Sequence, residues 1–183
     1  MKKLSQIPTS ERIHIAFFGR CNSGKSSLIN ALTGQEVAIV SEMAGTTTDS
    51  VLKPIELPGV GATILIDTPG LDDNTPLGNQ RKAQSLKALD KTDIAVVLFH
   101  DDDTSVEEAL ITQLSARKTP IIGVISKCDT MQNRASLAAK VNDIIGSEPI
   151  ALSATTREGI EQLLARLASL SQQETRLITE GLC

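Results

Sequence analysis

The chain has few aromatic residues, few cysteines and no long apolar run, and each shortage excludes a class of protein. Its 183 residues include three Phe and no Tyr or Trp. We therefore expect an aliphatic core and few of the aromatic platforms on which single-stranded nucleic acids stack. The three cysteines, Cys21, Cys128 and Cys183, are far apart and form no C-x-x-C or Cys/His cluster. This pattern indicates neither a disulfide framework nor a self-contained metal site, and it fits a reducing compartment.

Apolar runs and charge limit the partners further. No run approaches the ~20 residues needed to cross a bilayer, and residues 1–11 lack the apolar stretch of a secretory signal. The net charge is −4 and the sequence pI is about 5.2. An acidic balance argues against a broad surface for nucleic acid or anionic membrane. We therefore expect a cytoplasmic protein with no membrane partner and no nucleic-acid partner.

Short apolar runs alternate with helix-length segments along the chain. The expected strands are residues 13–18, 51–57, 63–66, 94–99, 121–125 and 149–152. Several are continuously apolar, as parallel strands covered on both faces should be. This alternation predicts one doubly wound α/β domain with a six-stranded, mostly parallel sheet. The strands on either side of residues 58–61 have no helix between them, so they should form an antiparallel hairpin at one edge.

Apolar residues at three-to-four spacing mark the helices. One stripe consists of Ala83, Leu86 and Leu89, and others lie within residues 106–114, 137–145 and 160–170. Thr104 and Glu107 are spaced as a capping box for the second of these helices. We assign residues 1–170 to the domain and residues 171–183 to a helical extension or linker.

Residues 19–26 read G-R-C-N-S-G-K-S, which is the phosphate-binding-loop pattern. The octet follows an expected strand and precedes an expected helix, so its backbone N–H groups would form an anion cradle at the helix N-terminus. Lys25 would reach the terminal phosphates, and the Ser26 hydroxyl would ligate Mg²⁺. The predicted cradle consists of Asn22, Ser23, Gly24, Lys25, Ser26 and Ser27.

Two further motifs complete the phosphate and magnesium site. Asp67-Thr68-Pro69-Gly70 ends the third strand, where the Asp67 carboxylate can hold the magnesium shell and the Gly70 N–H can sense a γ-phosphate. One Thr hydroxyl of the stretch 45–49 should complete the magnesium shell when a triphosphate is bound. Each motif by itself is a common turn or polar loop, and their order along the chain is what makes them informative.

The nucleotide base is selected by motifs at the next two strand ends. In Ser126-Lys127-Cys128-Asp129, the Asp129 carboxylate can accept hydrogen bonds from N1–H and the 2-amino group of guanine, whereas adenine presents a lone pair there. Lys127 can lay its methylene stem over the purine. Ser153, Ala154 and Thr155 would close the pocket with a backbone N–H. Open α/β sheets bind ligands at the carboxyl ends of their strands.

Together these motifs resemble the translation-factor-related GTPases that include Era and TrmE, and most of all the N-terminal GTPase domain of HydF, the iron–iron hydrogenase maturation factor. The resemblance covers residues 12–168, and its most specific parts are residues 30–41, 45–49 and Leu71-Asp72-Asp73. It implies a three-layer P-loop NTPase fold, the Ras-like G domain, that binds GTP or GDP with Mg²⁺. The implied partners are downstream dimerisation and iron–sulfur domains or hydrogenase maturation proteins.

In this group an Asn in the phosphate loop marks potassium-activated hydrolysis. The resemblance therefore implies that Asn22 supplies a side-chain oxygen to K⁺, with further ligands from Ser41, Met43 and Thr46. Thr47 matches the family's magnesium-binding Thr. The residues implied in catalysis are Lys25, Asn22, Thr47 and Gly70.

Two departures from the family pattern bear on activity. Ser126 stands where the guanine motif usually has Asn, so we expect weaker binding without a change of base. Related enzymes also carry a water-orienting Glu about a dozen residues beyond Asp67, but no acidic residue lies between Asp73 and Asp90. Asn79 or Gln80 could position water without acting as a base, and slow hydrolysis is the expected consequence.

Three functional hypotheses remain open at this point. The first is a slow, potassium-stimulated GTPase switch for hydrogenase metal-cluster maturation. The second is a nucleotide-sensing module with negligible turnover, and the third is a GTPase acting in RNA or tRNA modification, as Era and TrmE do. The sequence leaves open the partner, the active nucleotide state and a nucleotide-dependent dimer.

Overall fold

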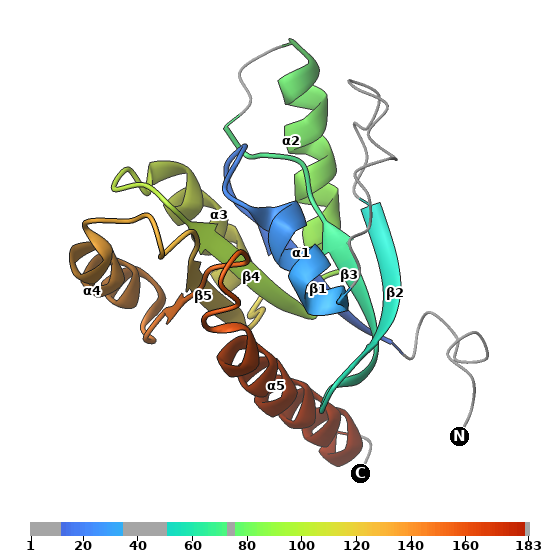
Figure 1. Cartoon of the computed structure of the whole chain (residues 1–183). Helices are drawn as coiled ribbons and strands as arrows, with labels where there is room; N and C mark the ends of the chain where they lie inside the picture. The colour runs from blue at the N-terminus through green and yellow to red at the C-terminus, as the bar shows by residue number, and fades with distance from the viewer. Residues whose placement is uncertain (1–11, 35–50, 73–75, 182–183) are drawn as a thin grey trace.

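The computed structural model of the chain describes residues 12–34, 51–72 and 76–181 (Figure 1). Strands and helices alternate, apart from one strand pair that follows in direct succession. In chain order the elements are β1 (Ile13–Phe18), α1 (Lys25–Thr33), β2 (Val51–Leu57), β3 (Gly61–Asp67), α2 (Pro76–Leu89), β4 (Ile94–Phe99), α3 (Ser105–Ala116), β5 (Ile121–Ile125), α4 (Arg134–Ile145), β6 (Ile150–Ala151) and α5 (Ile160–Glu180).

The six strands form one sheet in the order β2-β3-β1-β4-β5-β6. The pair β2–β3 is antiparallel, and every other pair is parallel. The predicted six-stranded, mostly parallel sheet with one antiparallel edge strand is confirmed. Strand β3 is longer than the predicted run 63–66, and β6 is shorter than the predicted run 149–152.

Helices cover both faces of the sheet and give the domain three layers (Figure 1). One apolar cluster packs α1 and α5 against the sheet, and a second packs α2, α3 and α4 against the other face. Successive residues of β1 point to opposite faces of the sheet, so that Phe17 belongs to the first cluster and Phe18 to the second. All three Phe are buried, so the few aromatics of this chain belong to its core.

The predicted apolar stripe of α2 is right at Leu89 and wrong at Ala83 and Leu86. Leu86 is 43% exposed and Ala83 is exposed, while Ser85, Ala88 and Leu89 face the core. Burial of Ser85 is tolerated because its hydroxyl donates to the carbonyls of Pro69 and Arg81, each at 3.1 Å. A satisfied polar residue can therefore occupy a core position that a pattern of apolar residues does not reveal.

The predicted capping box of α3 is also wrong. The Thr104 hydroxyl donates to Glu108 at 2.6 Å and makes no side-chain cap of the helix. The carboxylate of Asp103 accepts hydrogen bonds from the backbone N–H and hydroxyl of Ser105 instead, at 3.1 and 2.7 Å. The Glu107 side chain does not cap the helix. It is directed into the protein, where Glu107 is only 2% exposed.

Helix α5 crosses the predicted boundary at residue 170 without a break and ends at Glu180. The division into residues 1–170 and 171–183 stays a prediction. Among the residues that the structure describes, no helix combines the length and apolar character needed to cross a membrane.

Two glycines with the same backbone conformation offer a matched test of the packing at β6. Gly159 and Gly146 have φ angles of +79° and +80°, but a Cβ at Gly159 would lie 2.2 Å from the carbonyl oxygen of Ala151, whereas nothing lies within 4 Å of one at Gly146. Gly146→Ala should cost about 1 kcal/mol for the left-handed backbone. Gly159→Ala should cost roughly 2 kcal/mol more, because the strand must move to relieve the clash. Urea unfolding measures both, and equal losses would contradict this packing.

Candidate nucleotide-binding site

The strand register brings the predicted motifs to one edge of the sheet. In the parallel pairs, Phe17 lies beside Asp67, Phe99 beside Ile125, and Ile125 beside Ala151. The loops that follow these residues therefore begin at the same level. The phosphate loop, residues 67–72, residues 126–129 and residues 152–155 all leave the sheet at its carboxyl edge, as open α/β sheets require of a binding site.

The phosphate loop, residues 19–26, makes a tight turn between β1 and α1, in which Ser23 N donates to Arg20 O at 3.2 Å. Asn22 and Gly24 both have positive φ angles, 61° and 94°, which gives the tight path of an anion-binding loop. A Cβ at Gly19 would lie 2.6 Å from the Ser23 hydroxyl, so the loop needs glycine there. Gly24 is the N-cap of α1 and makes no side-chain cap, which leaves the first N–H groups of the helix available for an anion.

Lys25 is the seventh residue of the phosphate loop, and its side chain points back toward the first five. Its side chain is buried, and Nζ donates to the carbonyls of Arg20 and Gly19 at 2.7 and 3.1 Å and to the Ser23 hydroxyl at 3.3 Å. Burial lowers the pKa of Lys25, while nearby acidic groups, Asp67 foremost, oppose this effect. The ammonium group thus both fixes the loop and places positive charge beside the N–H cradle.

Ser26 and Asp67, predicted to ligate magnesium, lie side by side. The Ser26 hydroxyl donates to Asp67 Oδ2 at 2.8 Å. A hydroxyl and a carboxylate oxygen at this spacing are the hard donors that Mg²⁺ takes at phosphate sites, so the pair fits that ion. No group of three or more His, Cys, Asp or Glu within the described ranges is arranged to hold a metal ion. The other predicted cation ligands, Ser41, Met43, Thr46 and Thr47, lie outside the described residues.

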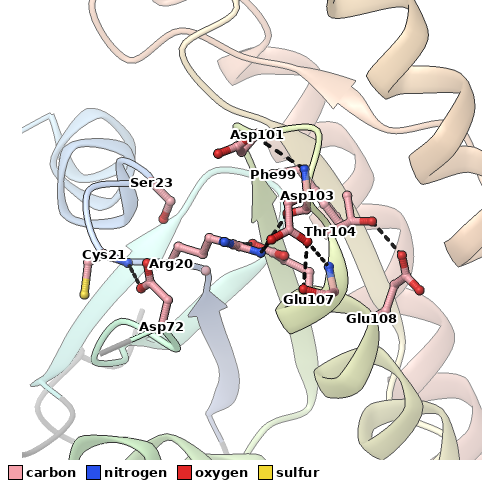
Figure 2. A network of polar contacts seen from close by, with 12 residues as sticks. Arg20, Cys21, Ser23, Asp72, Phe99, Asp101, Asp103, Thr104, Glu107 and Glu108 are labelled. Carbon is pink, nitrogen blue, oxygen red and sulfur yellow. Dashed lines mark hydrogen bonds and ion pairs between the residues drawn. The ribbon is translucent and has the colours of Figure 1, made fainter. Parts of the chain in front are cut away.

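Gly70 packs directly on the phosphate loop. A Cβ at position 70 would lie 2.3 Å from the sulfur of Cys21 and 2.7 Å from its backbone nitrogen. The next two residues are bonded to the same loop, since Leu71 N donates to Gly19 O at 3.1 Å and Cys21 N donates to Asp72 Oδ1 at 2.6 Å (Figure 2). No motif predicts this role for Asp72, although Leu71-Asp72-Asp73 is among the most specific parts of the family resemblance.

Arg20 ties the same loop to α3 (Figure 2). Its Nε lies 3.1 Å from Glu107 Oε1, and its Nη2 lies 3.2 Å from Asp103 Oδ2 and 2.7 Å from the Asp103 carbonyl. Hydrogen bonds from Ser105 and Arg20 lower the pKa of Asp103 to about 2. Sequence reasoning missed this network, because its partners are 87 positions apart and only the fold brings them together.

A cavity of about 90 Å³ joins the phosphate loop to the two predicted base-recognition motifs. Its walls come from three places at the carboxyl edge: the start of α1, the end of β5 and the segment after β6. The lining residues are Gly24, Ser27, Leu28, Ser126, Lys127, Asp129, Leu152, Ser153, Ala154 and Thr155. The structure thus brings together every residue predicted for the guanine pocket.

Ser126 stands where the family's guanine motif usually has Asn, and the contacts of this motif are made by Ser126 and Lys127. Ser126 is buried, and its backbone N–H and hydroxyl both donate to Phe99 O, at 2.9 and 3.3 Å, so it anchors the motif to β4. The Lys127 ammonium donates to the backbone carbonyl of Asn22. The link between the base motif and the phosphate loop is therefore made by a lysine ammonium and not by an amide.

Glu158, which sequence reasoning missed, braces the two base-recognition segments. Cys128 Sγ donates to its Oε2 at 3.4 Å, Arg134 of α4 bonds its Oε1 at 2.9 Å, and Ser153 N donates to its carbonyl at 3.0 Å. The hydrogen bond from Arg134, followed by that from Cys128, lowers the pKa of Glu158. The carboxylate therefore stays charged at neutral pH and holds the pocket walls together.

Comparison with known proteins assigns the family. The sequence profile of the 50S ribosome-binding GTPase family matches residues 14–127. The tRNA modification GTPase MnmE of Xanthomonas oryzae pv. oryzae (strain MAFF 311018) is 35% identical over 160 residues, which is 87% of this chain and 34% of MnmE. MnmE of Nitrosomonas europaea is 33% identical over 174 residues, 93% of this chain and 37% of that protein. The chain thus spans about a third of the length of these relatives.

Solved structures agree with this assignment. Era in complex with MgGDPNP and nucleotides 1506–1542 of 16S ribosomal RNA superposes with a TM-score of 0.73 at 26% identity, covering 86% of this chain and 56% of Era. The apo cytosolic domain of the T. maritima FeoB iron transporter shares the fold, with a TM-score of 0.64 at 21% identity over 88% of this chain and 65% of that chain.

These matches bear on two expectations. They support the predicted relationship to Era and to TrmE, which is the protein named MnmE above. They give no support to HydF or to hydrogenase maturation. The names of the relatives, a tRNA modification enzyme and an RNA-bound Era, also weigh against the expectation of no nucleic-acid partner, although only weakly. The predicted P-loop GTPase fold is confirmed, and the chain belongs to the 50S ribosome-binding GTPase family.

Proposed function

We propose that this chain is the GTP-binding and GTP-hydrolysing switch domain of a tRNA modification GTPase of the MnmE type. One observation carries the nucleotide assignment: a single cavity connects the phosphate loop at Gly24 and Ser27 with Asp129 and with residues 153–155. The tRNA context is supported by the MnmE relatives, which this chain covers over about a third of their length.

The described residues account for the binding step. Asp129, exposed at the pocket, accepts hydrogen bonds from N1–H and the 2-amino group of guanine, while Lys127 and the 153–155 segment flank the base. The phosphate-loop N–H groups and Lys25 hold the phosphates. Ser26 and Asp67 would hold Mg²⁺, which would supply charge neutralisation on the phosphoryl group being transferred.

Turnover should be slow, because no acidic residue lies between Asp73 and Asp90, the stretch in which related enzymes carry a water-orienting Glu. Helix α2 contains no Asp or Glu, and Asn79 and Gln80 are exposed on it. Either amide can position a water molecule but cannot accept its proton at neutral pH. A nucleotide-sensing module with negligible turnover is the alternative, and the rate of a single turnover distinguishes the two.

Potassium stimulation is part of the same proposal. Asn22 is the fourth residue of the phosphate loop, and its side chain is exposed. Its amide oxygen is therefore available to a monovalent cation next to the phosphates. Added positive charge at that point stabilises the transferring phosphoryl group. Ser41, Met43 and Thr46 are proposed as the remaining K⁺ ligands on the strength of the family resemblance.

Asp129→Asn tests base recognition. The substitution places a partial donor opposite the guanine N1–H, so GTP affinity should fall by about 100-fold while affinity for xanthosine triphosphate rises relative to it. Isothermal titration of both nucleotides measures the change. Asp143→Asn, an equal charge change on the exposed face of α4, is the control and should bind GTP as the parent does. Unchanged GTP affinity in Asp129→Asn would refute the pocket assignment.

Exchange of Na⁺ for K⁺ at constant ionic strength tests the cation. Hydrolysis by the parent should rise several-fold in K⁺, because a cage of oxygens spaced for K⁺ is too large for Na⁺. Asn22→Gly should abolish the difference, since it removes the amide without straining a residue whose φ is +61°. GDP affinity should stay near that of the parent. Equal single-turnover rates in the two salts would contradict the potassium proposal and favour the sensing module.

A further inference from the structure

We propose that Asp72 is a specificity-determining residue of this site: its carboxylate competes with the γ-phosphate for the phosphate loop and so disfavours GTP relative to GDP. This inference rests on the proposed nucleotide site. It concerns a residue that neither the motifs nor the comparisons assign to nucleotide binding.

The contact that carries the proposal is a hydrogen bond of the kind that phosphates make. Cys21 is the third residue of the phosphate-loop octet, and its backbone N–H donates to Asp72 Oδ1 at 2.6 Å (Figure 2). Backbone N–H groups of such loops are the donors that bind phosphate oxygens. A carboxylate oxygen on one of them therefore stands in the role of an anionic ligand, supplied by the protein itself.

The position of Gly70 places this contact beside the γ-phosphate. The Gly70 N–H is the group expected to sense the terminal phosphate, and Gly70 lies so close to Cys21 that a Cβ would fall 2.7 Å from the Cys21 nitrogen. A γ-phosphate within reach of Gly70 therefore comes next to the Cys21 N–H as well. GDP has no phosphate at that position and leaves the Asp72 contact intact.

The charge of Asp72 makes the competition unfavourable for GTP. Burial, the largest influence, raises its pKa, but hydrogen bonds from the Cys21 backbone and thiol outweigh burial and lower the pKa overall. The group is therefore ionised at neutral pH. Arg20, whose charge also lowers the pKa of Asp72, is already shared by Glu107 and Asp103, and Lys25 Nζ is bonded within the phosphate loop. A γ-phosphate brought to the Cys21 N–H would therefore meet the like charge of Asp72.

Displacement of Asp72 would also release its neighbours. Leu71 N holds Gly19 O at 3.1 Å, so the segment 70–72 is attached to the phosphate loop at both of its last two residues. When the γ-phosphate takes the Cys21 N–H, one of these two attachments is lost. Asp72 thereby links the choice between GTP and GDP to the position of the segment that follows β3.

Asp72→Asn tests the proposal, because it removes the charge and keeps the shape. Dissociation constants for GDP and for a non-hydrolysable GTP analogue are measured with Mg²⁺ present. The ratio of the two constants should shift by about tenfold in favour of the GTP analogue. Asp143→Asn, the same change on the exposed face of α4, should leave the ratio unchanged. An unshifted ratio, equal tightening of both nucleotides, or weaker binding of the analogue would overturn the proposal.

A second measurement separates this inference from the nucleotide assignment. Amide hydrogen exchange at Cys21 is followed by NMR in protein stripped of nucleotide, for the parent and for Asp72→Ala. Exchange at Cys21 should accelerate at least about tenfold in the variant if the contact is real, and equal exchange would overturn the proposal. A parent that bound no guanine nucleotide would refute the proposed function, whereas the exchange experiment would still report on the Asp72 contact.

Discussion

Lys25 carries a positive charge that is almost wholly removed from water, and the loop between β1 and α1 is folded around it. Two carbonyls and a hydroxyl of that loop accept its three donors, so the ammonium fixes the backbone path that turns N–H groups toward an anion. A buried charge is tolerated only where it is fully bonded. The loop conformation, the start of α1 and the positive potential of the site all depend on this one group.

Carboxylates on both sides of the loop extend this constraint to the rest of the domain. Arg20 is held by Glu107 and Asp103 of the α3 region, and Cys21 is held by Asp72 after β3. The phosphate loop is thereby linked to elements on either side of β1 in the sheet order. Arg20 and Cys21 occupy variable positions of the phosphate-loop motif. The contacts that link this loop to the rest of the domain are therefore not specified by the motif itself.

The base-recognition side of the site depends on a different set of contacts. Ser126 anchors its motif to β4, Lys127 reaches the phosphate loop, and Glu158 joins Cys128 to the segment after β6. Three separate strand ends are therefore fastened to one another around one cavity. Because these loops are bonded to one another, displacement of one of them would disturb the contacts of the other two.

The sequence by itself determined the sheet, both ends of four of its six strands, the phosphate loop and the residues that line the proposed base pocket, because these depend on local patterns: continuous apolar runs and motifs at strand ends. It misassigned part of the buried face of α2 and the cap of α3. Buried Ser85 bonds the carbonyls of Pro69 and Arg81, and buried Glu107 bonds Arg20 through Oε1, 87 positions away. The sequence led to HydF where the relatives indicate MnmE and Era, since neighbouring families share the same motifs. Only the tertiary structure decided which carboxylates hold the loop, because Cys21 meets Asp72 and Arg20 meets Glu107 through strand register. No local pattern encodes a contact between residues 51 or 87 positions apart.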